Sequence, residues 1–192
     1  MRSLLSRVLL AAAILALAIG GTTRAQSWDN DGCSNATLNG DYAFTVSGSF
    51  IVPGGPTVQR LGVAMTHFDG MGGLKQVDYV VSNVPPPGTP PGAPPKEWPT
   101  APSDSVTGFH IDETGTYTVH SDCTGTFTIN FPKFSNGIPG AVIVTKFVLA
   151  NHGRSIYTVV TSLTPPGAQA ALPPTAVFIT SQGHKLGQLG PE

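Results

Sequence analysis

The sequence contains few charged residues, and this shortage limits the partners that the protein can bind. Asp, Glu, Lys and Arg make up 11% of the 192 residues, against about 25% in ordinary globular domains. The 10 basic residues are outnumbered by 11 acidic ones and form no basic patch. We therefore expect no binding to nucleic acid or to anionic membrane surfaces. The uncharged polar surface, together with many Gly and Pro, is typical of an extracellular β protein.

The sequence also lacks the motifs that mark metal centres, reactive nucleophiles and phosphate sites. Its five histidines are scattered and show no H-x-H, H-E-x-x-H or Cys/His spacing. There is no G-x-S-x-G motif, and the glycines of 70–73 join two expected strands without the helix that would bind an anion. We therefore expect no metal and no cofactor, whereas a Ser/His/Asp triad built from distant residues stays open.

No apolar run is long enough to span a bilayer, which needs about 20 residues. The longest run, Val8–Gly20, follows Arg2 and Arg7 and precedes small residues at Thr23 and Ala25. This pattern predicts a secretory signal peptide over residues 1–25 rather than a membrane anchor. Residues 26–192 would then be one domain of a secreted or periplasmic protein without a membrane span.

Cysteine is nearly absent: Cys33 and Cys123 are the only two. In an exported chain two cysteines most simply form one intramolecular disulfide. Free thiols and an intermolecular bridge are the alternatives. Because the closed loop would be long, the chain-entropy argument gives about 4–5 kcal/mol of stabilisation as an upper figure.

The clearest pattern that is present covers Gly115–Phe131, where apolar and polar residues alternate on both sides of Ser121–Gly125. A period of two is typical of half-buried antiparallel strands, and the central five residues have turn chemistry. The sequence therefore predicts a hairpin whose turn carries Cys123. Its apolar face consists of Tyr117, Val119, Phe127, Ile129 and Phe131.

The rest of the chain predicts further short strands separated by turns, with no helical period after the signal peptide. We expect Asp112–Gly115 to be a turn into the hairpin, His184–Glu192 to be a loose tail, and Gly48 to mark a bulge or tight bend. Eight or nine such strands predict an all-β, antiparallel up-and-down barrel. The expected strands are Tyr42–Val52, Val58–Phe68, Leu74–Val84, Ser105–Ile111, Ala141–Ala150, Ser155–Ser162 and Thr175–Ser181.

A dense cluster of prolines lies between two of these strands, in Pro85–Pro102. Each proline lacks a backbone donor, so this segment cannot join a sheet and is expected to be an extended surface loop. It could act as a lid, but its composition favours a solvated spacer.

Three motifs resemble those of a known group of proteins. They are Gly40-Asp41-Tyr42-x-Phe44, Phe68-Asp69-Gly70-x-Gly72 and Gly115-Thr116-Tyr117-x-Val119-x-x-Asp122-Cys123-x-Gly125-Thr126. They are similar to motifs in secreted bacterial proteins that in turn resemble the calycin-like barrels of the allene oxide cyclase and dirigent type. The resemblance covers roughly Cys33–Ser181 and implies an eight-stranded barrel with an apolar cavity. In that superfamily some members guide cyclisation or coupling and others only bind.

Polar and aromatic side chains on apolar faces are the candidates for lining such a cavity. His67 shares its parity with Leu61 and Val63 and precedes a turn, so we expect it to face inward near one end of the barrel. A neutral imidazole there could orient a ligand or move a proton. A core role with satisfied hydrogen bonds is the alternative. The full set of candidates is Tyr42, Phe44, Met65, His67, Tyr79, Tyr117 and Phe127.

These patterns predict a secreted β-barrel that binds a small apolar molecule or acts as an envelope or interaction module. The alternative is a cofactor-free cyclase or isomerase that uses a cavity lined by Tyr and His. An enclosed cavity with a buried, converging histidine or carboxylate would favour the enzyme, whereas an interior filled by Phe and Tyr would favour the module. The oligomeric state stays open, with a homo-oligomer among the alternatives.

Overall fold

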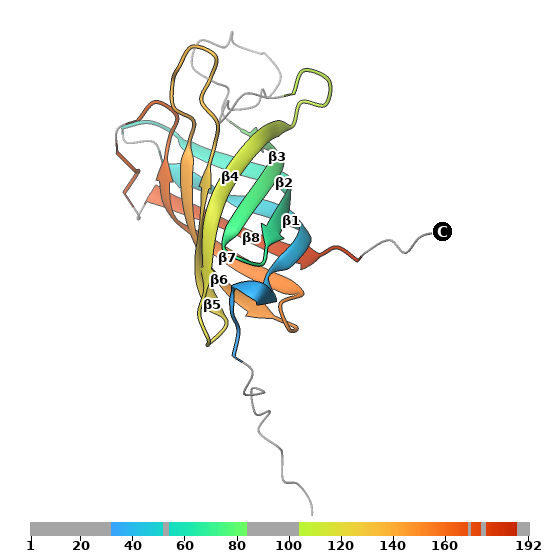
Figure 1. Cartoon of the computed structure of the whole chain (residues 1–192). Coiled ribbons are helices and arrows are strands. Elements are labelled where there is room, and N and C mark those ends of the chain that lie inside the picture. Colours follow the sequence, from blue (N-terminus) through green and yellow to red (C-terminus); the bar gives the residue numbers. More distant parts are fainter. Residues whose placement is uncertain (1–31, 52–53, 84–103, 169, 174–175, 188–192) are drawn as a thin grey trace, which may run out of the picture. The chain divides into compact units, whose positions relative to one another are not determined.

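The computed structural model describes residues 32–51, 54–83, 104–168, 170–173 and 176–187. These residues form a closed barrel in which every strand pairs antiparallel with its neighbours in the chain, and β8 pairs with β1 (Figure 1). The predicted all-β up-and-down barrel is therefore confirmed. The predicted signal peptide (1–25) and the Pro-rich loop (85–102) lie outside the described residues. The strands are β1 (Asn39–Ile51), β2 (Thr57–Asp69), β3 (Gly73–Ser82), β4 (His110–Val119), β5 (Thr124–Asn130), β6 (Val142–Ala150), β7 (Ser155–Thr164) and β8 (Val177–Lys185).

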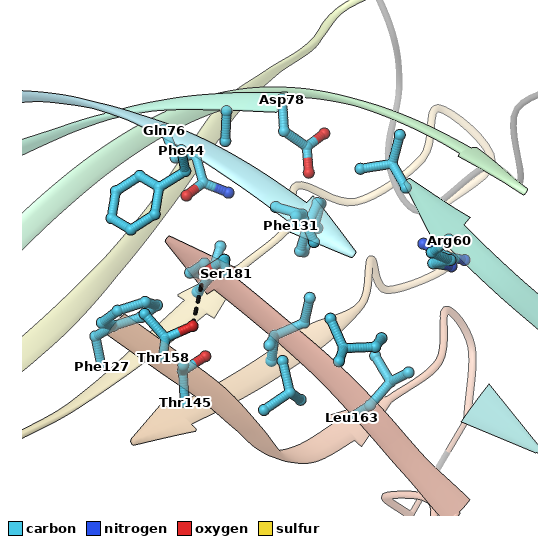
Figure 2. A pocket seen from close by; sticks show the side chains of 17 residues that line it. Phe44, Arg60, Gln76, Asp78, Phe127, Phe131, Thr145, Thr158, Leu163 and Ser181 are labelled. Carbon is cyan, nitrogen blue, oxygen red and sulfur yellow. Dashed lines mark hydrogen bonds between the residues drawn. The ribbon is translucent and has the colours of Figure 1, made fainter. Parts of the chain in front are cut away.

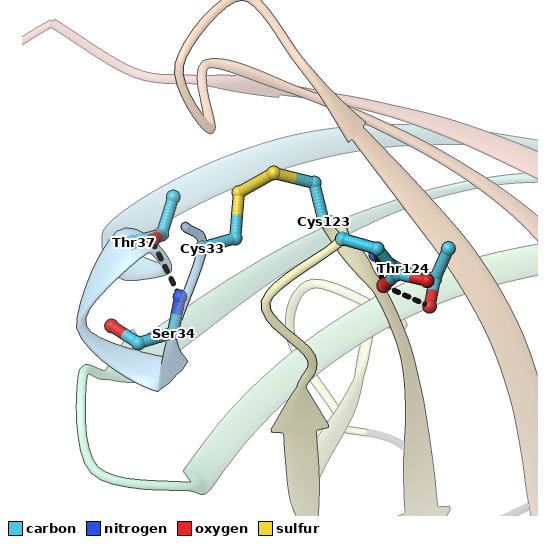
Figure 3. Close-up of a disulfide and its surroundings, with 6 residues drawn as sticks. Cys33, Ser34, Thr37, Cys123 and Thr124 are labelled. Atoms are coloured by element: carbon cyan, nitrogen blue, oxygen red, sulfur yellow. Dashed lines mark hydrogen bonds between the residues drawn. A yellow bond between two sulfur atoms is a disulfide. The ribbon is translucent and has the colours of Figure 1, made fainter. Parts of the chain in front are cut away.

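The central hairpin forms as its alternation predicts. In the β4–β5 pair Tyr117 lies opposite Phe127, and all five residues of the predicted apolar face are buried. The predicted disulfide between Cys33 and Cys123 is also present (Figure 3). It joins the segment before a short 3-10 helix, η1 (Asn35–Thr37), to the β4–β5 turn. Such bonds persist in oxidising compartments outside the cytoplasm.

One end of the barrel interior is filled by an aromatic core. Phe68 is fully buried and meets Tyr42 and Tyr117 edge to face, with ring centroids 5.4 and 5.1 Å apart. The Tyr42 hydroxyl donates to the Gly153 carbonyl at 2.6 Å, and the Tyr117 hydroxyl donates to the Leu38 carbonyl at 2.8 Å. Both tyrosine hydroxyls in this aromatic core are therefore buried with a hydrogen-bond partner.

Three predictions about strand boundaries are wrong. The expected strand Ser105–Ile111 forms only at its end, because residues 105–107 are a turn and β4 begins at His110. The expected turn at Asp112–Gly115 is instead part of β4, which runs without interruption from His110 to Val119. An irregularity in the β3–β4 register accommodates the polar residues without ending the strand. The loose tail was expected to start at His184. Instead, β8 continues through Lys185, which pairs with Tyr42 of β1.

The expected inward face of β2 is also wrong, because the apolar parity of this strand faces outward. Leu61, Val63 and Met65 are 62%, 48% and 50% exposed, whereas Arg60 and Thr66 are buried. On β3 the same reversal buries the polar side chains and leaves the alternate, apolar ones partly exposed. The buried polar residues are Gln76, Asp78 and Ser82, and the partly exposed apolar residues are Val77, Tyr79 and Val81. The β2–β3 wall thus directs polar side chains into the barrel.

Gly48 allows the barrel to close between β1 and β8. Its φ is +148°, and a Cβ at this position would overlap the backbone of Phe178 on β8. The register of β1 with β8 shows no shift at this point, so the glycine marks a close approach of two strands rather than a bulge. No helix among the described residues is long and apolar enough to cross a membrane.

Candidate functional site

The barrel interior next to the aromatic core contains a cavity of about 80 Å³ (Figure 2). Most of its lining is apolar and comes from several strands. A cavity of about 150 Å³ is known to take up benzene, so this one suits a smaller molecule, or several waters, in the conformation described. The apolar lining includes Phe44, Val46, Ala64, Phe127, Phe131, Val160, Leu163 and Ile179, and the polar lining includes Arg60, Gln76, Asp78, Thr145, Thr158 and Ser181.

Three ionisable side chains meet beside this cavity. The His110 Nδ1 atom lies 2.6 Å from the Asp78 Oδ1 atom, and both side chains are buried. Gln76 Nε2 donates to Glu113 Oε2 at 2.7 Å, and Thr66 Oγ1 donates to Gln76 Oε1 at 2.8 Å. Asp78 and Gln76 line the cavity directly, so this network forms one polar wall of an otherwise apolar space.

A bulge in β4 explains why His110 and Glu113 both point inward. Residues three apart on a regular strand face opposite sides of the sheet. Here Gln76 pairs with Glu113 while Asp78 pairs with His110, so β4 holds one extra residue between these pairs. Asp112 has a φ of +63°, a left-handed conformation that Asp adopts more readily than most residues.

Burial changes the acidity of Glu113. Burial away from solvent is the largest cause, and the neighbouring Asp78 carboxyl is the second. Together they raise the pKa of Glu113 to about 10. Glu113 therefore carries a proton near neutral pH. The Glu113 Oε1 atom is buried and has no hydrogen-bond partner among the described residues. This wall therefore contains a polar atom whose hydrogen-bonding capacity is not used.

The same three side chains could hold a cation. Asp78, His110 and Glu113 each offer one ligand atom, and these atoms lie within 4.8 Å of one another. Oxygen and imidazole nitrogen donors suit several divalent metals. Sequence spacing alone predicted no metal site, because the residues come from two strands that only the barrel brings together. Hydrogen bonds already engage all three side chains.

Arg60 is the fourth buried ionisable group in this half of the barrel. Its guanidinium lies over the Phe50 ring, 5.1 Å from the centroid. Burial lowers the pKa of Arg60 to about 10, an effect that the Asp78 carboxylate opposes. Arg60 therefore remains a cation near neutral pH. In contrast, the Thr158 and Ser181 hydroxyls bond each other at 2.6 Å (Figure 2).

The residues predicted from the sequence to line the cavity lie in different parts of the structure. Phe44 and Phe127 do line the cavity, and their contact with a ligand stays a prediction. Tyr42 and Tyr117 belong to the aromatic core, where backbone carbonyls bind their hydroxyls. Met65 lies on the outer face of β2.

The expectation that His67 faces inward is wrong. Its side chain is 53% exposed, and its Nδ1 atom lies 2.8 Å from the Asp41 Oδ1 atom on the outside of the barrel. The same reversal of parity places Tyr79 half-buried on the outer side of β3, where it packs against Phe109 with centroids 5.6 Å apart.

Sequence reasoning missed the polar residues that the cavity brings together. Their signal was present in β3, where Gln76, Asp78 and Ser82 recur at a period of two, but that polar parity is usually assigned to solvent. His110 and Glu113 gave no such signal, because only the bulge places them on one face.

No family model matches the chain, and no curated protein or solved structure matches it either. The structure shows an eight-stranded, closed, antiparallel barrel, and membership of the calycin-like superfamily stays a prediction from the motifs. The function therefore has to be argued from the cavity and its polar wall.

Proposed function

We propose that this protein is an exported barrel that binds one small, mainly apolar molecule in its interior cavity. The observation that carries the proposal is a cavity with apolar lining on most sides and a wall of buried ionisable groups on β2, β3 and β4. Ligand sites commonly combine an apolar surface with a few converging polar groups. The disulfide supports an oxidising compartment, in agreement with the predicted signal peptide.

The buried ionisable groups of this wall are not explained by the stability of the barrel alone. Burying an ionisable group is costly unless it is paired and hydrogen-bonded. Arg60, Asp78, His110 and Glu113 are nevertheless all buried in the same half of the interior. Each buried polar atom left without a partner costs about 1–3 kcal/mol. A bound molecule that supplied the missing contacts would offset part of this cost.

A proton-transfer enzyme is the second candidate, and one observation favours it. The Asp78 carboxyl faces the cavity and is oriented by the His110 imidazole, while Glu113 beside it carries a proton. Such a set could accept and return a proton on a bound substrate, as a cofactor-free isomerase or cyclase requires. Tyr42, Tyr117 and His67, which the sequence offered for this role, do not line the cavity.

The binding proposal is tested by filling the cavity. Ala64 lines it, so Ala64→Leu should abolish the binding of a small neutral probe such as 1-propanol. The matched control is Ala43→Leu, which adds the same atoms at an exposed position on neighbouring β1 and should leave binding unchanged. Protein-observed NMR titration gives the affinity and the position of the probe. Shifts confined to the outer face, or equal affinity of both variants, would contradict the proposal.

A native mass spectrum of the protein purified from the exported fraction provides an independent test. It would reveal a co-purified ligand, and the same molecule should then be absent from Ala64→Leu but present in Ala43→Leu. To separate the second candidate from simple binding, Asp78→Asn is incubated with that ligand. A binding protein leaves the ligand chemically unchanged in every variant, whereas an enzyme converts it only when Asp78 is present.

A further inference from the structure

Arg60 and Ser82 lie directly opposite each other in the β2–β3 pair. Both side chains are buried inside the barrel, and directly opposed residues have Cβ atoms about 4.5–5.5 Å apart. Figure 2 shows Arg60 at one end of the cavity lining, away from Phe44 and Phe127 at the other end. Arg60 lines this end of the cavity, and Ser82, which is not among the lining residues, lies buried next to it on β3.

Both side chains have an atom without a partner. Arg60 Nε and Ser82 Oγ are buried and form no hydrogen bond within the described part of the chain. The two ion pairs found among the described residues both involve histidine and an aspartate, so neither contacts Arg60. A guanidinium and a hydroxyl are both hydrogen-bond donors. Their natural common partner is an oxygen that carries negative charge.

We propose that Arg60 and Ser82 form an anion-binding subsite, and that the molecule bound in the cavity is an apolar carboxylate. This inference rests on the proposed function, which it deepens by naming the class of ligand. Arg60 Nε–H and the Ser82 hydroxyl donate to the carboxylate oxygens. The apolar body of the ligand lies against Val160, Leu163 and Ile179, which line the same cavity.

The charges of the cavity also fix the orientation of such a ligand. The Asp78 carboxylate lines the β3 wall of the cavity, and it repels a second carboxylate. Arg60 attracts it, and the Phe50 ring under the guanidinium keeps the Arg60 side chain in place. The carboxylate therefore lies at the Arg60 end, and the apolar part extends toward Phe44 and Phe127.

The test compares propanoate with 1-propanol, which has the same carbon chain without the charge. At pH 7.5 the unmodified protein should bind propanoate more tightly by roughly 10- to 100-fold, the range expected for hydrogen bonds to a charged group. Arg60→Met should remove this preference. Ser82→Ala should reduce the preference for propanoate by about tenfold. Lys75→Met, which removes a cation from the exposed face of β3, should change neither affinity.

Each other outcome overturns the inference in a different way. If the unmodified protein binds both molecules equally, the anion subsite is wrong while cavity binding stands. If it binds neither, the proposed function fails and the subsite fails with it. If Arg60→Met still prefers propanoate, Arg60 acts only as a counter-charge to Asp78. Should Arg60→Met not fold, Ser82→Ala decides the question, because it removes one hydroxyl and no charge.

Discussion

The two halves of the barrel interior treat their polar groups in opposite ways. At the disulfide end, the hydroxyls of Tyr42 and Tyr117 both end on backbone carbonyls, and Phe68 fills the space between the rings. In the cavity half, atoms of Arg60, Ser82 and Glu113 are buried without partners among the described residues. The first half is complete by itself and supplies stability, whereas the second has polar groups that a bound molecule can satisfy.

If this contrast holds, truncation should cost most in the aromatic half. Phe68→Ala removes the ring that both tyrosines contact and should lower the free energy of unfolding by about 3–5 kcal/mol. Phe178→Ala, on the outer face of β8 where the side chain is 57% exposed, is the control and should cost less than about 0.5 kcal/mol. Urea unfolding gives both values. Similar losses in the two variants would mean that Phe68 is not central to the core.

The disulfide should account for the next largest effect at the same end. It closes a loop with a sequence separation of 90 residues, so the Cys33→Ser/Cys123→Ser double variant should lose about 2–4 kcal/mol of stability, because the unfolded chain gains freedom. Denaturant unfolding measures the loss. Thiol titration of the unfolded, unreduced protein should find no free thiol, and two free thiols would refute the bond.

In the cavity half, Glu113 should make stability depend on pH. Its pKa is about 10 in the folded protein against an ordinary value of 4.5, so between these values the folded state binds more protons than the unfolded state. Stability therefore falls as pH rises through this window, by up to about 1.4 kcal/mol per pH unit. Glu113→Gln removes that contribution and should flatten the decline between pH 6 and 9, as measured by urea unfolding with EDTA present.

The control for Glu113 is the neighbouring exposed carboxyl. Asp112→Asn changes an exposed acid next to it in sequence, and asparagine tolerates the positive φ of this position. Asp112→Asn should keep the pH dependence of the unmodified protein. Parallel stability curves for Glu113→Gln and the unmodified protein would show that Glu113 titrates normally.

The smallest effect is expected on the outer surface, at His67. Exposed ion pairs contribute little to stability, so His67→Ala should change the free energy of unfolding by less than about 0.5 kcal/mol. The affinity for 1-propanol should also stay the same, because the imidazole pairs with Asp41 outside the barrel. Parallel melting curves and NMR titrations measure both quantities. A loss of binding would place His67 in the ligand site after all.

The sequence predicted those parts of the fold whose determinants are local. The Tyr117–Phe131 alternation and the turn at Asp69, whose carboxylate accepts three backbone N–H groups, depend only on neighbouring residues. The inner face of β2 was mispredicted because alternation reports two faces but not which one is inside. The usual assignment, apolar side inward, fails where Arg60, Gln76 and Asp78 take the interior.

The candidate site was harder to predict than the fold, and for a different physical reason. Arg60, Asp78 and His110 lie on three strands and meet only through strand pairing that links distant parts of the chain. Their spacing in sequence therefore has no fixed relation to their spacing in the cavity. The one residue that sets the inward direction of His110, Asp112, shows no unusual feature except a residue type that tolerates positive φ.

The bulge at Asp112 means that the length of β4 matters as much as its composition. Removing that one residue would restore simple alternation, so that His110 and Glu113 could no longer face the same side. The polar wall would be dismantled although every side chain that forms it was still encoded. Barrels of this architecture can therefore gain or lose interior chemistry through a single-codon insertion or deletion, a change that comparisons of residue identity alone do not detect.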